Sequence, residues 1–316
     1  MAVSTETRPA PSKKQQSFNR KQRRTIAFFS FISPWLVGFV LLGLFPLALG
    51  LATSFTNYDG LNLPFLKFVG FDNYARAFSD EDLWFAFGQT IKWGLINVPL
   101  WVGGSFGLAL ILNQGIKARG VFRTIYYIPS LIPIAVAVRS WRLILERNYG
   151  MMNVFISLFT EEPFAVAWMS EYALAGMTLI SLWSGLGSGM IIFLAGLQGI
   201  PESLIEASKI DGANGWQVFR HITLPLMSPV IFFQLIMALI GSFQQMNLPL
   251  VVSQLGNSMG VPPRPVYLYM IHTYRQIFSF QRYGYGTAML WILFAIVLLL
   301  TGLVFYTQRF WVFYDD

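Results

Sequence analysis

The sequence predicts an all-α membrane protein with six transmembrane helices, and three observations support this fold class. Hydrophobic residues make up 55% of the 316 residues and charged residues only 12%, whereas about a quarter of the residues in a soluble domain are charged. Apolar runs of about twenty residues, each long enough to cross a hydrocarbon core of about 30 Å, recur along the chain. All fifteen acidic residues fall between these runs or in the tails. We therefore expect a multi-pass membrane protein.

The expected spans differ in regularity. The third contains Pro129 and Pro133 and the fifth contains Pro249, so we expect both to be interrupted, with neighbouring helices shielding the freed carbonyl groups. The first is about twice as long as the apolar core of a signal peptide and no small-residue cleavage site is evident after it, which predicts an uncleaved anchor. The spans lie near residues 27–54, 88–112, 122–145, 173–197, 227–252 and 285–307.

The distribution of positive charge predicts the orientation. The first 26 residues carry seven basic residues against one acid, Glu6, whereas the loop after the first span has Lys67 and Arg76 against five acids. By the positive-inside rule, the N-terminus is cytoplasmic. Six crossings return the C-terminus to the cytoplasm and place the charged loop at 198–226 on the same side. We expect the basic tail to lie on anionic lipid headgroups.

The charged loop between the fourth and fifth spans has its own helical pattern. Pro201 suits a first helical turn, and residues 202–209 are helix formers with one apolar side. Asp211-Gly212 predicts a break, and a second turn carrying Trp216, Val218 and Phe219 follows. Pro225 is expected to stop or kink the chain as it re-enters the membrane. The pattern predicts a short amphipathic helix, a glycine break and a second helix.

Composition excludes several function classes. The chain has no cysteine, and His221 and His272 are too far apart in the topology to form a metal cluster. No G-x-x-x-x-G-K-[ST] phosphate loop occurs, so the chain is not its own ATPase. No basic stripe interleaves with aromatic residues outside the membrane, which argues against nucleic acid as a partner. We expect no catalytic residue, cofactor or metal on this chain, and the absence of an acid within the spans argues against ion coupling.

The spacing within the charged loop matches a known motif. The loop resembles the EAA loop of binding-protein-dependent ABC importer permeases. The matching pattern is Glu206-Ala207-Ser208, three residues, Gly212, nine residues and then Ile222-x-Leu224-Pro225. Ser208 stands where that family usually carries alanine. Further segments resemble the carbohydrate-uptake branch of that family in order and spacing. These are Phe68–Tyr74, Phe122–Pro129, Tyr149–Asn153 and Ile191–Pro201.

The resemblance implies a type I, MetI-like permease core and a coupling helix that docks into a groove on a cytoplasmic ATPase. Glu206 would face a basic residue of that ATPase, and Gly212 would be the hinge. The implied coupling residues are Glu206, Ala207, Ser208, Asp211, Gly212, Ala213, Ile222, Leu224 and Pro225. The expected organisation is a basic cytoplasmic tail (1–26), the first span and outer loop (27–84), the permease core (85–307) that includes the coupling loop (198–226), and a cytoplasmic tail (308–316).

The implied function is the permease subunit of an ATP-driven importer for a sugar, oligosaccharide or polyol. The implied partners are a second homologous permease subunit in a heterodimer, two ATPase subunits that bind ATP and Mg, an extracytoplasmic solute-binding protein and membrane lipid. The location would be the prokaryotic cytoplasmic (inner) membrane. An importer of glycerol phosphate esters is an alternative within the class. An ion-coupled secondary carrier and a structural membrane scaffold are alternatives from other classes.

The spans on either side of the coupling loop carry neutral polar residues that suit a sugar. Ser184 and Ser188 share a helix face next to Trp183, and Gly185, Gly187 and Gly189 leave room for close helix approach. After the loop, amide and hydroxyl side chains recur within a few positions. Helix packing is the competing interpretation for the serines and Trp183. The candidate substrate-path residues are Trp183, Ser184, Ser188, Ser242, Gln244, Gln245 and Asn247.

Overall fold

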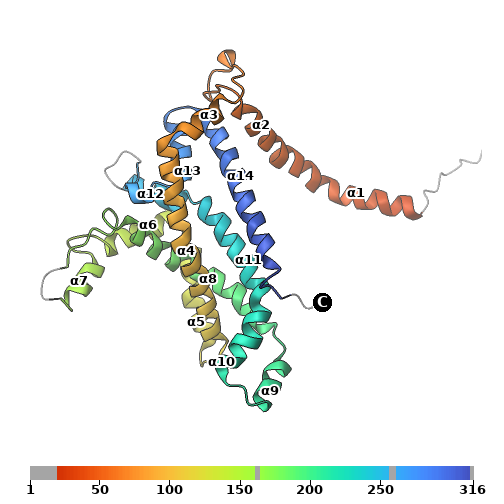
Figure 1. Cartoon of the computed structure of the whole chain (residues 1–316), viewed down its shortest axis with the longest axis vertical. Helices are drawn as coiled ribbons and strands as arrows, with labels where there is room; N and C mark the ends of the chain where they lie inside the picture. The colour runs from red at the N-terminus through yellow and green to blue at the C-terminus, as the bar shows by residue number, and fades with distance from the viewer. Residues whose placement is uncertain (1–19, 161–163, 256–260, 314–316) are drawn as a thin grey trace, which may run out of the picture. The chain divides into compact units, whose positions relative to one another are not determined.

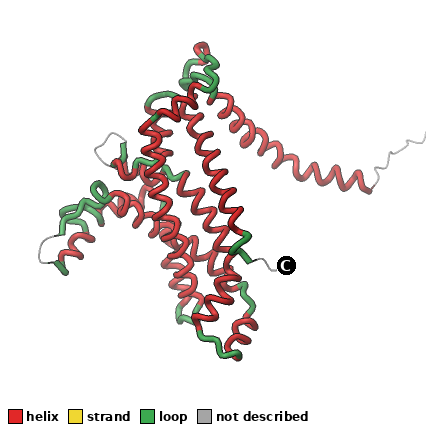
Figure 2. Tube along the Cα trace, viewed as in Figure 1, coloured by secondary structure: helices red, strands yellow, loops and turns green. Residues whose placement is uncertain are grey.

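The computed structural model describes residues 20–160, 164–255 and 261–313. Within these ranges the chain is built from helices and contains no strand beyond a single β-bridge between Thr56 and Phe68 (Figure 2). The predicted all-α fold class is confirmed. The chain divides into two units, residues 1–52 and 53–316.

The first unit is dominated by one long apolar helix. It comprises α1 (Arg20–Phe39), a π-helical turn at Val40–Leu44 and α2 (Phe45–Ser54), whose last two residues belong to the second unit. Its membrane-length segment, Arg23–Ser54, has no buried residue in its most apolar stretch. Because such a surface is unfavourable in water, this helix requires lipid or another protein around it.

The second unit is a bundle of four long helices with shorter helices at both ends (Figure 1). Five helices of the described chain, including that of the first unit, are long and apolar enough to cross a membrane, and a bent pair would make the sixth. The long helices are α4 (Glu81–Asn113), α8 (Ala173–Gln198), α11 (Leu224–Phe243) and α14 (Tyr283–Gln308). Apart from those between α8 and α11, the shorter helices are α3 (Asp72–Ser79), α5 (Arg119–Tyr127), α6 (Ile134–Ile144), α7 (Met151–Ser157), α12 (Asn247–Leu255) and α13 (Tyr269–Tyr274).

The third predicted span is strongly bent. Its two halves, residues 119–131 and α6, meet at an angle of 102°. Pro129 lies in the first turn of the 3₁₀ segment Ile128–Leu131, and Ile132 is extended, as a residue before proline prefers to be. Pro133 is the N-cap of α6. The predicted interruption is confirmed, with the two prolines on either side of the bend.

The fifth predicted span is interrupted at a different place from the one predicted. α11 ends at Phe243 with Gln244 as its C-cap, and α12 begins at Asn247. Pro249 is the third residue of α12, so the prediction that it breaks the helix is wrong. Proline is tolerated in a first turn because its missing N–H would have no intrahelical partner there.

The predicted stop at Pro225 does not occur, because the helix continues through this residue. α10 (Gly215–Val218) continues through a π-helical turn at Phe219–Thr223 into α11, and the Leu224 N–H donates to the Phe219 carbonyl. The wider turn makes room for a proline ring that would otherwise clash with the preceding turn. Pro46 likewise follows the π-helical turn at Val40–Leu44. The same device therefore carries two helices through a proline.

α8 packs closely against α4 and α5 at the glycines predicted to leave room for close helix approach. A Cβ added at Gly187 would lie 2.0 Å from the Tyr126 carbonyl oxygen, and one at Gly189 would lie 2.6 Å from Ser105 Oγ. The Ser105 hydroxyl donates to the Leu186 carbonyl across the interface, at 3.2 Å. In a membrane, helices associate through such close backbone approach and interhelical hydrogen bonds.

Two asparagines hold the loops that resemble the importer family. Asn73 Nδ2 donates to the carbonyls of Ser54 and Thr56, each at 2.8 Å. Asn153 is buried, and its Nδ2 donates to three carbonyls, including that of Val166 at 2.9 Å. Its Oδ1 accepts from Trp168 Nε1 at 2.8 Å. Both asparagines thus satisfy backbone groups at chain reversals.

A buried polar cluster joins the start of α4 to α13 and α14. His272 is 3% exposed, and its Nε2 lies 3.3 Å from Asp80 Oδ2, which also accepts from the Tyr285 hydroxyl at 2.6 Å. Tyr267 Oη lies 2.9 Å from His272 Nδ1 and accepts from Arg275. These partners fit a neutral imidazole that donates from Nε2 and accepts at Nδ1.

Titration of this cluster couples to stability. Burial lowers the pKa of His272 below its ordinary 6.5, although the charge of Asp80 opposes the shift. Burial alone would raise the pKa of Asp80, but the hydrogen bonds from Tyr285 and the Leu83 N–H, together with His272, bring it below its ordinary 3.8.

We predict that replacing Gly187 with alanine destabilises the bundle by about 3 kcal/mol, because the new methyl group meets backbone that cannot rotate away. Gly241→Ala is the matched control, since nothing lies within 4 Å of its Cβ position. Thermal unfolding in detergent measures both. Equal unfolding temperatures for the two variants would contradict the close packing of α8.

We also predict that the protein loses stability as the pH falls below about 6.5, because protonation of His272 favours the unfolded state. A second loss follows below about pH 4, as Asp80 takes up its proton. Unfolding temperatures between pH 7 and pH 5 test the first loss. His272→Gln should flatten the profile in this range, and His221→Gln, which replaces an exposed histidine, should not; the reverse pattern would refute the assignment.

Candidate coupling surface and membrane path

The loop between α8 and α11 forms a helical elbow, which we define as residues 201–218. α9 (Glu202–Ile210) begins after Pro201 as N-cap, and Asp211 is its C-cap. Gly212 has a φ of +80°, the left-handed conformation that favours glycine after a helix. The Gly212 N–H donates to the Lys209 carbonyl and the Ala213 N–H to the Ser208 carbonyl. The predicted sequence of helix, glycine break and second helix is confirmed.

The second half of the elbow is fixed by its own cap. The Asn214 side chain accepts from the Gln217 N–H at 2.9 Å, and the Gln217 side chain accepts from the Asn214 N–H at 2.7 Å. This reciprocal pair satisfies two backbone donors at the start of α10. The short helix α10 therefore has a defined start and continues into α11.

The elbow lies at one end of the bundle (Figure 1), and it carries exposed apolar and acidic side chains. Ile210 is 87% exposed, Trp216 66% and Leu204 44%. Glu206, Ala207 and Asp211 are also exposed. Glu206 has no ion-pair partner among the residues that the structure describes. Exposed apolar side chains rimmed by polar residues are typical of protein or membrane interaction sites.

The other side of the elbow faces the ends of α4 and α8. Ile205, Ala213 and Val218 line a cavity of about 390 Å³ together with Leu110 of α4 and Leu197 of α8. Of the remaining predicted coupling residues, the Ser208 hydroxyl donates to the Ile205 carbonyl. Ile222 and Pro225 are half-buried where the chain enters α11, and Leu224 is more exposed. Some of the predicted residues thus face outward and others face the bundle.

The predicted path residues on α8 differ in their contacts. The Ser184 Oγ is buried without a hydrogen-bond partner among the described residues. The Ser188 hydroxyl donates to the Gly185 carbonyl at 2.8 Å. The Trp183 ring contacts the Trp141 ring edge to face, with 5.8 Å between the ring centroids. It also lines a mainly apolar cavity of about 570 Å³ between α4, α5 and α8.

The predicted path residues after the elbow lie at the break between α11 and α12. Gln244, Gln245 and Asn247 sit at or beside this break and are partly or fully exposed. Ser242 is buried, and its hydroxyl donates to the Leu239 carbonyl. It lines a separate cavity of about 420 Å³ between α4, α11 and α14. The structure therefore gathers the three amides but places Trp183 and Ser242 in different cavities.

Sequence reasoning missed two polar residues on α4. Trp93 is fully buried, and its indole N–H has no hydrogen-bond partner among the described residues. The Oδ1 atom of Asn97 is also buried and has no such partner. Their spacing of four places them on one helix face. An amide one helical turn from an indole within an apolar run is the signal that could have identified them. Unpartnered buried polar atoms in a bundle are candidates for contact with a solute.

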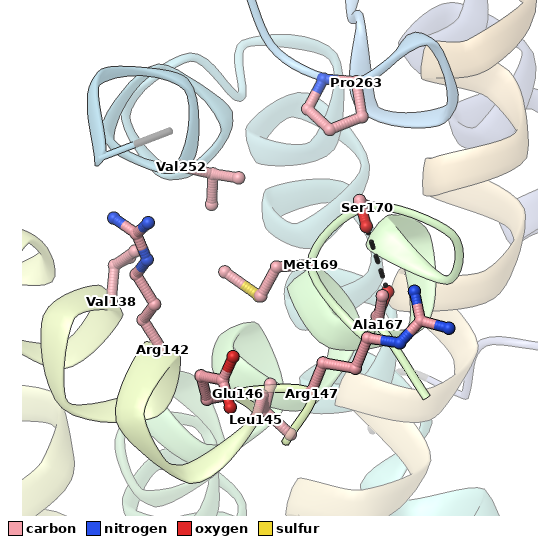
Figure 3. Close-up of a pocket in the computed structure, with 10 residues that line it drawn as sticks. All are labelled: Val138, Arg142, Leu145, Glu146, Arg147, Ala167, Met169, Ser170, Val252 and Pro263. Atoms are coloured by element: carbon pink, nitrogen blue, oxygen red, sulfur yellow. Dashed lines mark hydrogen bonds between the residues drawn. The ribbon is translucent and has the colours of Figure 1, made fainter. Parts of the chain in front are cut away.

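A more polar cavity of about 310 Å³ lies between α6, the following turn and α12 (Figure 3). Arg147 forms an ion pair with Glu171 at 3.4 Å. The Glu146 carboxylate accepts the backbone N–H groups of Asn148 and Tyr149. Those hydrogen bonds, that of Tyr149 above all, lower the pKa of Glu146. These charged side chains hold the turn in place.

No group of three or more potential metal ligands occurs among the described residues. The described chain combines exposed apolar side chains on the elbow, buried polar atoms without partners, and interrupted helices. Broken helices of this kind are used by transporters to expose backbone groups to a solute.

Comparison with known proteins defines the class. Residues 100–311 match the model of the family described as "Binding-protein-dependent transport system inner membrane component". The chain belongs to this family of transport permeases. It is 36% identical over 299 residues to the probable ABC transporter permease protein YesP of Bacillus subtilis, covering 93% of this chain and 94% of the relative.

Other relatives extend the comparison. The probable starch degradation products transport system permease protein AmyD of Thermoanaerobacterium thermosulfurigenes is 30% identical over 289 residues, covering 90% of this chain and 94% of AmyD. A crystal structure of a bacterial ABC transporter involved in the import of alginate contains a chain of the same fold. The TM-score is 0.78 at 21% identity, over 92% of this chain and 97% of that one.

We predict that Ser184→Ala does not destabilise the protein, because the hydroxyl it removes is buried without a partner. Ser242→Ala, the control, should lose up to about 1 kcal/mol with its hydrogen bond to the Leu239 carbonyl. Thermal unfolding of both variants in detergent measures the difference. A larger loss for Ser184→Ala than for Ser242→Ala would show that Ser184 has a structural partner.

Proposed function

We propose that the chain is the permease subunit of an ATP-driven importer that passes a sugar, oligosaccharide or polyol from an extracytoplasmic binding protein into the cytoplasm by alternating access. The observation that carries this proposal is the elbow, which combines the Glu206-to-Pro225 spacing with exposed Ile210 and Trp216. A docking surface that is continuous with membrane-length helices suits a subunit moved by a partner.

The elbow is joined to the two helices that carry the candidate path residues. α9 follows α8 after a connection of three residues, and α10 runs into α11 without a gap. A force applied to α10 is therefore delivered directly to α11 and to the break at Gln244. We propose that Glu206 pairs with a basic residue of the ATPase and that Gly212 allows α9 to adjust its angle.

We propose that partner proteins supply the ATP hydrolysis, the rest of the membrane path and the capture of the solute. Two ATPase subunits would bind ATP and Mg, and a second homologous permease subunit would complete the membrane path. An extracytoplasmic binding protein is supported by a solved relative, a bacterial alginate ABC transporter in complex with an alginate-bound periplasmic protein. The proposed location is the prokaryotic cytoplasmic (inner) membrane, with both termini in the cytoplasm.

The cargo proposed is a saccharide. Relatives are named for the transport of trehalose and maltose, of arabinooligosaccharides and of lactose. Hydroxyl and amide side chains on α8 and at the α11–α12 break offer hydrogen bonds to sugar hydroxyls, and neither long helix carries a lysine or arginine. A saccharide is therefore favoured over a glycerol phosphate ester.

The test is uptake of radiolabelled sugars into vesicles that contain the assembled complex. We expect uptake to require ATP and to fall about thirtyfold with Glu206→Lys, because the docked charge pair becomes repulsive. An ATPase with the opposite charge reversal should restore it. Asp72→Lys is the control, since Asp72 is an exposed acid on α3 at the opposite end of the bundle. Uptake that persists without any ATPase would contradict the proposal.

A further inference from the structure

The end of the bundle that carries the elbow also holds two arginines that share one neutral acceptor. Arg119 is the first residue of α5, and Arg123 follows one turn later on the same face. With its amide oxygen turned toward them, Gln198 at the end of α8 accepts from Arg123 Nη2 at 2.8 Å and also from Arg119 Nη2. Within the described ranges, neither arginine has an acidic partner.

The positive charge of this pair is not neutralised by its surroundings. Two guanidinium groups that donate to one oxygen lie close together and repel each other. Arg119 Nη2 also reaches Asn113 Oδ1 at 3.5 Å, which is again a neutral acceptor. The Nε of each arginine is buried and donates to no described residue. Unsatisfied buried donors are rare in native proteins, and here they surround a concentration of positive charge.

An apolar cavity lies further along α5, beyond the two arginines. The cavity of about 570 Å³ between α4, α5 and α8 includes Ile125 and Tyr126, which follow Arg123 within one turn, and Pro129 beyond them. Ile111 of α4 and Leu182 and Leu186 of α8 form its other walls. Val121 and Ile125 are also exposed on α5. α5 thus carries the two arginines in its first turns and lines the apolar cavity with residues further along.

We propose that Arg119 and Arg123 bind the phosphate of an anionic membrane lipid, with an acyl chain of that lipid in the cavity between α4, α5 and α8. Arginine forms strong charge-assisted hydrogen bonds with phosphate, and basic pockets between membrane helices bind anionic headgroups. The apolar cavity favours a lipid over a free phosphate or an acidic peptide, neither of which would fill it. The same cavity contains Trp183, one of the candidate path residues, whereas no residue of the elbow lines it.

The test is native mass spectrometry of the full-length chain with three probes: dioleoyl-phosphatidylglycerol, dioleoyl-phosphatidylcholine and inorganic phosphate. We expect retention of phosphatidylglycerol in preference to phosphatidylcholine and no retention of inorganic phosphate. Arg119→Gln/Arg123→Gln should weaken phosphatidylglycerol binding by about thirtyfold, or roughly fivefold per arginine. Arg139→Gln/Arg220→Gln, which removes two exposed arginines elsewhere, should leave it unchanged.

Several outcomes would overturn the proposal. Equal retention of both lipids, tight binding of inorganic phosphate, or unchanged binding by the Arg119→Gln/Arg123→Gln variant would each do so. Phosphatidylglycerol binding that disappears when the permease is assembled with its ATPase would assign the arginines to a protein contact instead. Arg119→Lys/Arg123→Lys keeps both charges, so its preference for phosphatidylglycerol should survive even if the glutamine variant misfolds. Loss of that preference would also refute the proposal.

Discussion

The close approach of α8 to α4 and α5 is the constraint on which the rest of the structure depends. Lipid is as apolar as the helix surfaces, so burial of apolar side chains does not by itself hold membrane helices together. Gly187 packs against the Tyr126 carbonyl, and Gly189 packs against Ser105. A single methyl group at either glycine would prevent these contacts. With α8 fixed in this way, the elbow that follows it has a defined position at the end of the bundle.

The two ends of the bundle differ in how far their polar and charged groups are satisfied within the chain. At one end, Asp80, His272 and Tyr285 tie the start of α4 to α13 and α14 through buried hydrogen bonds. At the other end, the elbow leaves Ile210 and Trp216 exposed, and Arg119 and Arg123 share only neutral acceptors. Internal bonds at the first end hold the bundle together, whereas the second end retains groups that can bind partners.

The sequence predicted the helix, break and helix of the elbow because cap residues and Gly212 act locally. It also identified the glycines through which α8 approaches its neighbours closely. The effects of the prolines were predicted less well, since they depend on where each helix starts. Pro249 falls in a first turn, and Pro225 follows a π-helical turn. The 102° bend and the burial of the Trp93 indole arise from contacts between distant segments, which an apolar pattern does not encode.

The elbow is central to the proposed function, as the surface that would receive force from an ATPase. Because the chain contains no cysteine, a single Ile210→Cys substitution provides a unique thiol at the most exposed large apolar residue of the elbow. Thiol-directed cross-linking in membranes that contain the assembled complex tests the claim most directly, with Phe71→Cys next to α3 as the control. The account predicts a cross-link from Ile210→Cys to the ATPase and none from Phe71→Cys. An Ile210→Cys thiol that forms no such cross-link and reacts with a membrane-impermeant reagent added outside intact cells would contradict it.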